Sequence, residues 1–325
     1  MKRKLSLLLV FALLVTMLTG CGMKANYEVT NDGKLYGTAK IYMTDEEKAA
    51  YDEVAEGESA EGYIGKEVVN GVEYHVYATE KELVEKTAGM IVTPEKFYVD
   101  SASEVMDDGS EEVDLLEFSF MTLSVTMPKE IVKTNGTLSA DKKTATWELL
   151  SIKDSAIYAY TTANPKTNSI SLKTGSAKYV KANKAISIST KDKAEFVTLS
   201  NGAVIDGNKN SKVFVNGIKF DGKKKTLTFR KSGTYKFTVW TTTNFKSFTV
   251  KVDGDKPTVK GVANNKTYKK SVKITFKDKL SGVKSATLNG KKIKSGKKIT
   301  KAGKYTLVVT DKVGNKTTIK FKIKK

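Results

Sequence analysis

The chain is poor in the residues that usually carry covalent or catalytic chemistry. Its 325 residues include one cysteine, Cys21, one histidine, His75, and only four prolines. A single cysteine cannot form a disulfide within the chain, so each domain must be stabilised by its own hydrophobic core. Because 39% of the residues are apolar, the composition is that of a folding chain, and its length leaves room for several domains.

The first 21 residues have the parts of an export signal. A basic segment at 2–4 precedes an apolar run at 5–18 and two small residues at 19–20. The run is shorter than the roughly 20 apolar residues that span a bilayer as a helix. The stretch Leu-Thr-Gly-Cys at 18–21 resembles the lipobox of bacterial lipoprotein signals.

This resemblance implies a signal peptide over residues 1–20 and a diacylglycerol on the sulfur of Cys21. Two acyl chains anchor a protein stably, whereas one chain binds reversibly. We therefore expect the protein to lie on the outer face of a bacterial membrane, held by its lipid. The alternative is a chance cysteine beside an ordinary cleavage site.

Charge is divided unequally along the chain. Residues 22–174 hold 15 lysines against 28 acidic residues, net −13, whereas residues 175–325 hold 38 basic against 8 acidic residues, net +30. All but one of those cations are lysines, and Arg230 is the exception. Base readout favours arginine, so we predict no nucleic-acid partner and expect anionic cell-wall polymer or anionic lipid instead. The alternative is a solvated surface that keeps the protein soluble.

The basic half contains an internal repeat, read as two β-sandwiches at 175–254 and 255–325. KAISISTKDK (184–193) matches KSVKITFKDK (270–279), and KSGTYKFTVW (231–240) matches KAGKYTLVVT (301–310). Apolar residues alternate with polar ones in both copies, and Asn-Gly pairs mark hairpin turns.

The second copy resembles the bacterial immunoglobulin-like repeats of surface proteins. In that family an Asp-x-x-Gly-Asn turn, here Asp311, Gly314 and Asn315, joins the last two strands. The first copy is divergent, because TTTNFKSF replaces this turn. We predict a turn and not a calcium site, since Asp311 has no acidic neighbour in sequence and calcium needs several convergent carboxylates.

The acidic segment, residues 21–165, is predicted to be mixed α and β. Its pattern predicts a hairpin at 26–43, helices at 44–56 and 79–89 with caps at Thr44 and Thr79, and a long strand at 115–128. Apolar residues change phase along that strand, which predicts a β-bulge near 121–122.

This segment is similar to the LppM-type lipoprotein domain family. The similarity rests on NDGKLYGTAKIYM and on MTLSVTMPKEIVKTNGTLSADKKTATWELL, which carries a proline, an Asn-Gly turn and a tryptophan. It implies an α+β fold, helices packed on a curved and mostly antiparallel sheet, with an apolar cleft for lipid. The alternative is an ordinary filled core. The cleft candidates are Phe118, Phe120, Leu123, Val125 and Trp147.

No enzyme is expected from these residues. His75 is predicted to be an exposed strand histidine, Cys21 is the lipidation site, and no nucleophile-elbow, phosphate-loop or dinucleotide motif is present. The acidic run at 107–112 is read as a solvated turn. A hydrolase that uses only aspartate and glutamate is a minor alternative.

We therefore predict a lipid-anchored, non-enzymatic surface protein without cofactor or metal. Its first domain would bind an amphiphile or a protein partner, and its basic modules would contact anionic envelope polymer. The alternative is a structural spacer or adhesion-type protein without a small ligand. The oligomeric state is not predicted.

Overall fold

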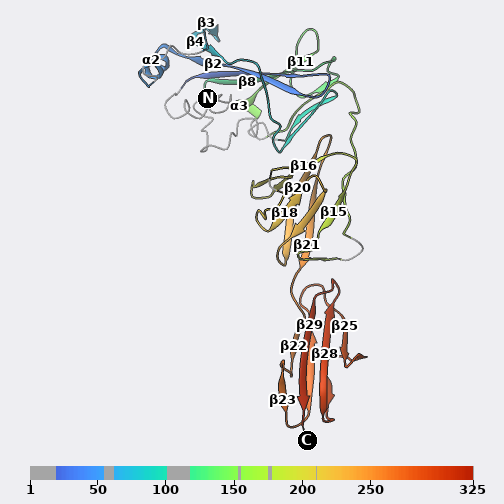
Figure 1. Cartoon of the computed structure of the whole chain (residues 1–325). Helices are drawn as coiled ribbons and strands as arrows, with labels where there is room; N and C mark the ends of the chain where they lie inside the picture. The colour runs from blue at the N-terminus through green and yellow to red at the C-terminus, as the bar shows by residue number, and fades with distance from the viewer. Residues whose placement is uncertain are drawn as a thin grey trace. The chain divides into compact units, whose positions relative to one another are not determined.

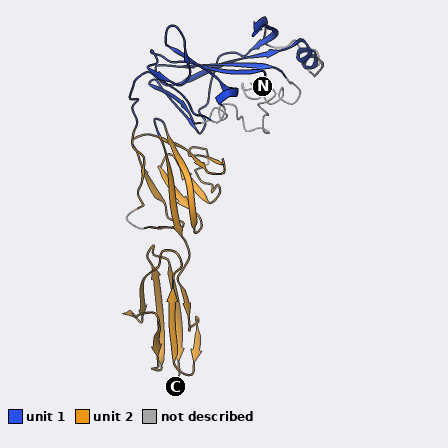
Figure 2. Cartoon of the chain, turned by 180° about the vertical axis from the view of Figure 1, so that it is seen from behind, with its two compact units in different colours: residues 1–167, 242–244 blue, residues 168–241, 245–325 orange. Residues whose placement is uncertain are grey.

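The computed structural model of the protein describes residues 20–54, 62–100, 118–152, 155–174, 178–209 and 211–324. The chain divides into two compact units (Figure 1, Figure 2), residues 1–167 with 242–244 and residues 168–241 with 245–325. Residues 1–19 of the predicted signal peptide (1–20) and the acidic run at 107–112 lie outside the described residues. In the part that is described, no helix is both long enough and apolar enough to cross a membrane.

The first unit is built from two β-sheets. Its larger sheet has the strand order β10-β11-β8-β1-β2-β4-β3, with β5 paired to β2, and its smaller sheet has the order β6-β7-β12-β9. The larger sheet comprises β1 (Gly22–Val29), β2 (Leu35–Met43), β3 (Tyr63–Val69), β4 (Val72–Ala78), β5 (Glu82–Leu83), β8 (Phe120–Thr126), β10 (Thr137–Leu138) and β11 (Thr144–Glu148). The smaller sheet comprises β6 (Met90–Thr93), β7 (Lys96–Val99), β9 (Lys133–Thr134) and β12 (Ile157–Tyr160).

The main core of this unit lies between the two sheets. Met121, Leu123 and Val125 of β8 face it at every second position and are fully buried. Phe97 and Val99 of β7, also fully buried, belong to the same cluster from the smaller sheet. In both sheets the buried side chains lie at every second position of a strand, so they meet in one core between the sheets, as in a β-sandwich.

Helices contribute little to the first unit, and the predicted α+β class is wrong. The described residues contain one ten-residue helix, α2 (Asp45–Val54), and one turn, α3 (Leu149–Ile152). The predicted start of α2 is confirmed, because the Glu47 amide donates to Thr44 Oγ1 and the Thr44 amide donates to Glu47 Oε2, at 3.3 and 2.7 Å.

The second predicted helix, at 79–89, is not formed. There the chain runs beside β2, where the Thr79 amide donates to the Ala39 carbonyl and the Val84 amide to the Leu35 carbonyl. Thr79 Oγ1, the expected cap, instead accepts a bond from the Ala39 amide at 2.9 Å. A sheet edge with free backbone groups has therefore overridden the local helix pattern.

The predicted bulge near residues 121–122 is also wrong. Strand β8 pairs with β1 in continuous parallel register from Gly22 opposite Phe120 to Glu28 opposite Thr126. The change of phase has another cause, since Phe120 packs on the opposite face of the sheet against Tyr42 and Tyr74. Both faces of the strand bear apolar residues, so no register shift is needed.

The second unit contains two β-sandwiches in sequence. The first has sheets ordered β13-β15-β19-β18 and β14-β21-β20-β16-β17, and the second has sheets ordered β22-β24-β27 and β23-β29-β28-β25-β26. The strands of the first are β13 (Ser171–Leu172), β14 (Val180–Lys181), β15 (Ile186–Ser189), β16 (Ala194–Leu199), β17 (Val204–Asp206), β18 (Ile218–Asp221), β19 (Thr226–Phe229), β20 (Gly233–Thr241) and β21 (Phe245–Asp253). Those of the second are β22 (Thr258–Lys260), β23 (Lys266–Tyr268), β24 (Val272–Lys277), β25 (Val283–Leu288), β26 (Lys291–Lys292), β27 (Lys297–Ile299), β28 (Gly303–Asp311) and β29 (Lys316–Ile323).

The two sandwiches share pairing details as well as strand order. In each, a short early strand runs parallel to the last strand, β14 beside β21 and β23 beside β29. A register shift recurs where β16 meets β20 and where β25 meets β28. Asn216-Gly217 and Asn289-Gly290 both have positive φ at each residue, as a type I′ turn requires. The immunoglobulin-like architecture of the repeat is thus confirmed.

Candidate functional site: apolar cluster, charged network and lysine faces

The five apolar residues proposed to line a cleft do not share one surface. Leu123, Val125 and Trp147 lie together in the core between the two sheets, exposed by 0, 0 and 3%. Phe118 precedes β8, is half-buried and packs against this same core, whereas Phe120 lies on the other face of the sheet. The structure therefore brings four of the five to one core and separates Phe120.

Trp147 is fixed by a hydrogen bond, a ring contact and a close backbone segment. Its indole nitrogen donates to Asn135 Oδ1 at 3.0 Å, and its ring centroid lies 6.3 Å from that of Phe97. Gly136 lies so near that a Cβ there would be 2.7 Å from the indole. Because the glycine of the predicted Asn-Gly pair has no Cβ, the backbone can lie directly against the tryptophan ring.

Cys21 lies immediately before β1, with 4% of its surface exposed. Its carbonyl oxygen accepts bonds from the Ser119 amide at 2.8 Å and from Ser119 Oγ at 3.0 Å. Ile41, Met43 and Tyr77 form an apolar cluster with it. The residue proposed for lipidation is thus joined directly to the larger sheet of the first unit.

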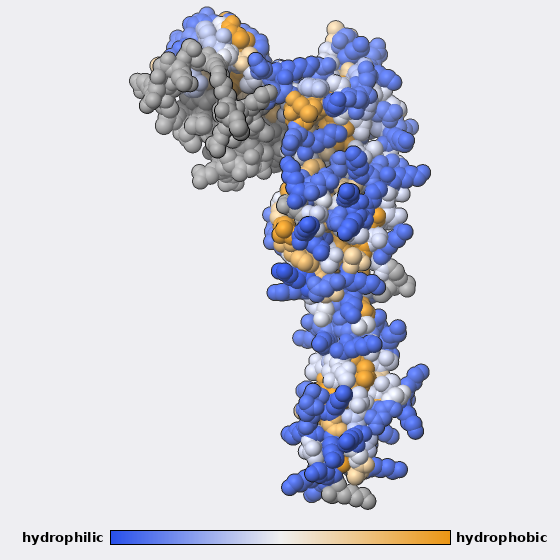
Figure 3. Space-filling model, in the orientation of Figure 1, coloured by the Kyte–Doolittle hydropathy of each residue, from blue (hydrophilic) through white to orange (hydrophobic). Residues whose placement is uncertain are grey.

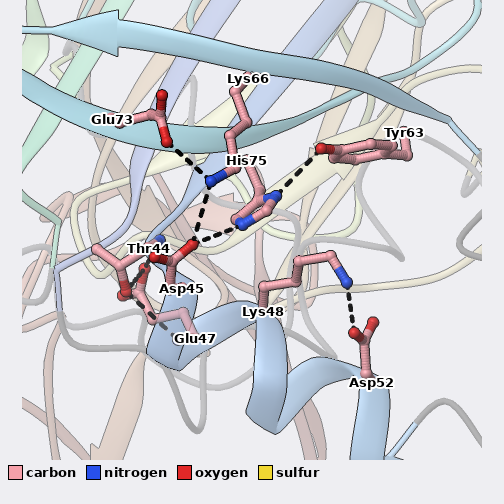
Figure 4. Close-up of polar contacts among 9 residues, drawn as sticks. All are labelled: Thr44, Asp45, Glu47, Lys48, Asp52, Tyr63, Lys66, Glu73 and His75. Carbon is pink, nitrogen blue, oxygen red and sulfur yellow. Dashed lines mark hydrogen bonds and ion pairs between the residues drawn. The ribbon is translucent and has the colours of Figure 1, made fainter.

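His75 belongs to a polar network, shown in Figure 4, and is not the exposed histidine that the sequence predicted. Its side chain is 13% exposed, with Nε2 2.7 Å from Asp45 Oδ1 and Nδ1 3.1 Å from the Tyr63 hydroxyl. Lys66 lies 3.6 Å from Asp45 and 2.8 Å from Glu73. The hydrogen bond from His75, with the charge of Lys66, lowers the pKa of the Asp45 carboxyl below its usual range.

This network joins the first residue of α2 to the β3–β4 hairpin. Both ring nitrogens of His75 have a partner within the network, and the carboxylate of Asp45 is 84% exposed. The arrangement explains how a short helix is fixed to a sheet. It also supplies a charge at the helix N-terminus, where a carboxylate is favoured by the helix dipole.

Lysines cover the outer faces of the second sandwich, which we call the lysine faces. Lys316, Lys320 and Lys322 alternate with the buried Ile319, Phe321 and Ile323 along β29, so every lysine side chain points outward. Figure 3 shows hydrophilic side chains over much of the visible surface of both sandwiches. The lysine faces are defined by Lys273, Lys298, Lys304, Lys316, Lys320 and Lys322, all exposed.

Two pairs of these lysines lie directly opposite one another. Lys304 on β28 is the register partner of Lys322 on β29, and Lys273 on β24 is the partner of Lys298 on β27. Like charges in this position destabilise a sheet. Within described residues 255–324, no lysine nitrogen lies within 4.0 Å of a carboxylate oxygen. The cations of this sandwich are therefore left uncompensated by the protein itself.

The one arginine of the basic half is differently placed. The guanidinium of Arg230 lies 4.7 Å from the centre of the Phe214 ring, and Lys219 lies 5.4 Å from the same ring. These contacts are cation–π interactions with the protein's own aromatic residue. Arg230 therefore contacts an aromatic ring of the protein itself, whereas the six residues of the lysine faces form no ion pair with a carboxylate among the described residues.

Acidic residues come together at one place in the described chain at a spacing that could hold a metal ion. Asp253, Asp278 and Asp311 each offer an oxygen, and these oxygens lie within 4.8 Å of one another. Sequence reasoning missed this group because its members are 25 and 33 residues apart. The alignment of the two repeats contained a signal, since Asp311 occupies the position of Thr241 at the end of the equivalent strand.

Comparisons with known proteins leave the chain without a family. No protein-family model matches it, and no curated protein sequence matches it. Among solved structures, SGBP-B of the mixed-linkage glucan utilization locus of Bacteroides ovatus, in complex with a mixed-linkage heptasaccharide, is 14% identical with a TM-score of 0.20. The match covers 62% of this chain and 63% of that chain. Titin domains I67–I69 are 11% identical with a TM-score of 0.26, covering 70% and 91%.

An S-layer protein, rSbsC(31-844), is similar at the same level. It is 10% identical with a TM-score of 0.20, and the match covers 93% of this chain and 54% of that one. The chain thus spans less than two thirds of the SGBP-B chain and of the S-layer chain. At these scores the fold assignment rests on the sheet topology of the chain itself.

Proposed function

We propose that the protein is a non-enzymatic, extracytoplasmic binding protein, held to the outer face of a bacterial membrane by a lipid on Cys21. Its second sandwich binds anionic polymer of the cell envelope through the lysine faces. The observation that carries this proposal is the two pairs of opposed lysines, Lys304 with Lys322 and Lys273 with Lys298. A polyanion laid across the sheet would relieve the repulsion within each pair.

The balance of charge supports a dedicated role for this sandwich. Residues 255–325 contain 22 lysines and three acidic residues. A sandwich that needs only to remain soluble is served by interspersed charges of both signs. An excess of one sign on both faces, without ion pairs to carboxylates in the described residues 255–324, favours a partner of the opposite sign.

The first unit supplies the anchor and a second contact surface. Strand β3 lies at the edge of its sheet, and Ile64 and Val68 on it are 54 and 67% exposed, with Val72 at 46% on the neighbouring β4. Exposed apolar residues on an edge strand are suited to contact another molecule. We propose that an amphiphile or a protein partner of the first unit binds along this edge.

Release from isolated cell envelopes tests the two attachments separately. The full chain carrying its lipid should require detergent for release, whereas a Cys21→Ala chain added to the same envelopes should bind and then be released by salt alone, because exposed charges are screened at high ionic strength. If the Cys21→Ala chain does not bind at low salt, the lysine faces have no envelope partner. If the full chain is released without detergent, the lipid anchor is refuted.

The contact surface of the first unit is tested by native mass spectrometry and crosslinking. A bound lipid would identify an amphiphile, and a crosslink from β3 to another protein would identify a protein partner. Substituting Ile64 and Val68 by serine should remove either signal while leaving the core between the sheets intact. Retention of both signals in that variant would contradict this assignment of the edge.

A further inference from the structure

Three carboxylates meet where the second sandwich begins. Asp253 is the last residue of β21, Asp278 directly follows β24, and Asp311 is the last residue of β28. Asp253 and Asp311 are fully buried and Asp278 is half-buried. One oxygen from each lies within 4.8 Å of the others. Asp253 belongs to the last strand of the first sandwich, so the cluster contains residues of both sandwiches.

The local backbone fixes these carboxylates in place. Asp311 Oδ1 accepts bonds from the amides of Val313, Gly314 and Asn315 at 3.0, 2.6 and 2.7 Å. Asp278 Oδ1 accepts from the Leu280 and Gly282 amides. Asp253 Oδ1 and Oδ2 accept from the amides of Asp255 and Ser281, each at 3.0 Å. The Asp-x-x-Gly-Asn turn is therefore one wall of a preformed site.

Two buried oxygens at this site have no hydrogen-bond partner among the described residues. One is Asp311 Oδ2, and the other is Ser281 Oγ, in the residue whose amide contacts Asp253. Among the described residues, no lysine side-chain nitrogen lies within 4.0 Å of an oxygen of these carboxylates, although the surrounding sandwich is lysine-rich. A buried carboxylate oxygen without a donor is costly, and converging negative charges raise that cost further.

The first sandwich has an equivalent aspartate, Asp192, whose carboxylate accepts hydrogen bonds from uncharged side chains. Asp192 follows β15 as Asp278 follows β24, and Thr241 ends β20 as Asp311 ends β28. Asp192 accepts bonds from Thr241 Oγ1 at 3.1 Å and from the Asn168 side-chain amide at 2.6 Å. Here a hydroxyl and an amide donate to one carboxylate. In the second sandwich, Asp311 stands in place of Thr241 and Asp253 supplies a third carboxylate. A cation at this position would offset the charge of all three.

We infer that Asp253, Asp278 and Asp311 form a divalent-cation site that takes Ca²⁺. Calcium binds oxygen ligands at about 2.3–2.6 Å, so two ligands on opposite sides of one ion lie about 5 Å apart, consistent with the observed cluster. The unpartnered Asp311 Oδ2 belongs to one of these three carboxylates, Ser281 Oγ offers a further oxygen, and water would complete the coordination. Bound Ca²⁺ joins β21 of the first sandwich to β24 and β28 of the second.

Calcium titration of the full chain tests this site. The wild-type protein should bind one Ca²⁺ by isothermal titration calorimetry, with a dissociation constant in the range of about 0.1–1 mM that is usual for extracellular modules. Saturating Ca²⁺ should raise the melting temperature of the second unit by about 5 °C. An equal concentration of Mg²⁺, which demands tighter octahedral geometry, should give a much smaller shift.

Three variants separate a site from general charge screening. Asp311→Asn should lose the calorimetric signal and the thermal shift. Glu130→Gln removes an exposed carboxylate of the first unit, away from the cluster, and should keep both. The double variant Asp253→Asn with Asp311→Thr copies the donors of the first sandwich, so it should fold without Ca²⁺ and not respond to it.

The Ca²⁺ responses of the wild type and the variants together decide whether the site exists. Absence of a saturable Ca²⁺ signal in the wild type overturns the site, as does an undiminished signal in the double variant. Equal responses to Ca²⁺ and Mg²⁺ in all variants would show ionic screening and would also overturn it. If Asp311→Asn does not fold, the double variant still gives the comparison.

Discussion

Reversing one lysine of an opposed pair should make the fold more stable and the binding weaker. Lys322 is exposed on β29 and lies opposite Lys304 on β28. Lys322→Glu turns this repulsive pair into an attractive one. The same substitution removes one positive charge from the lysine faces and adds a negative one. Stability and affinity should therefore move in opposite directions.

The expected sizes follow from this geometry. Cross-strand charged pairs contribute roughly 0.2–1 kcal/mol, and like charges cost a similar amount, so the reversal should stabilise the sandwich by about 1 kcal/mol. For a domain of this size that is a rise in melting temperature of about 4–8 °C. Each lysine at an anionic surface contributes about 1 kcal/mol, so a two-unit change of charge should weaken binding about 30-fold.

Thermal unfolding and vesicle binding measure the two effects. Vesicles containing phosphatidylglycerol provide the anionic surface, and phosphatidylcholine vesicles are the uncharged control. Lys322→Gln is the matched variant, and it should lose about 1 kcal/mol of binding, roughly fivefold. If Lys322→Glu raises the melting temperature but binds like the wild type, the lysine faces serve only solubility. If it lowers the melting temperature, the opposed-pair reasoning is refuted.

Three further predictions concern the first unit. Gly136→Ala should destabilise it by about 1–3 kcal/mol in denaturant unfolding, because the added Cβ would lie 2.7 Å from the Trp147 ring, and an unchanged midpoint would contradict the packing described. Asp45→Asn should lower the melting temperature more at pH 6 than at pH 3, because the pKa of Asp45 is lowered in the folded state and its contribution is lost as pH falls; a difference independent of pH would refute this. Cys21→Ala should abolish incorporation of a labelled fatty acid, and persistent labelling would exclude Cys21 as the acylated residue.

The sequence predicted the second unit better than the first for a physical reason. In β29 the buried Ile319, Phe321 and Ile323 alternate with exposed residues that include Lys320 and Lys322, and in β28 buried residues alternate with half-buried ones from Leu307 onward. This alternation is typical of a strand with one buried face in an antiparallel sheet. The Asn-Gly turns then fix the register of each hairpin. In these strands the local sequence pattern and the tertiary structure agree, so the fold of the repeat could be predicted from the sequence.

In the first unit, tertiary contacts overrode local pattern at two places. Residues 79–89 carry a helix-like sequence, but the backbone of Ala39 and Leu35 offered hydrogen bonds at a sheet edge. The apparent phase change in β8 arose because Phe120 is buried on the second face of the sheet. A pattern of apolar residues cannot distinguish a bulge from a strand covered on both sides.

The carboxylate cluster could not be read from neighbouring residues in sequence. Asp253, Asp278 and Asp311 come from three strand ends that meet only when the sandwiches are folded. Their lack of lysine partners is likewise a property of three-dimensional placement, since lysines adjoin Asp278 and Asp311 in the sequence. Comparison of the two repeats position by position is the route by which sequence alone could suggest it.

The central claim is that the lysine faces bind polyanions by charge. Its most direct test is the affinity of the full chain for a phosphate-bearing polymer, measured from about 50 to 500 mM salt beside an uncharged polymer of equal length. We predict binding to the charged polymer only, with the logarithm of the affinity falling against the logarithm of the salt concentration at a slope on the order of −3, as about four released counterions would give. Equal affinity for both polymers, or a slope near zero, would contradict the account.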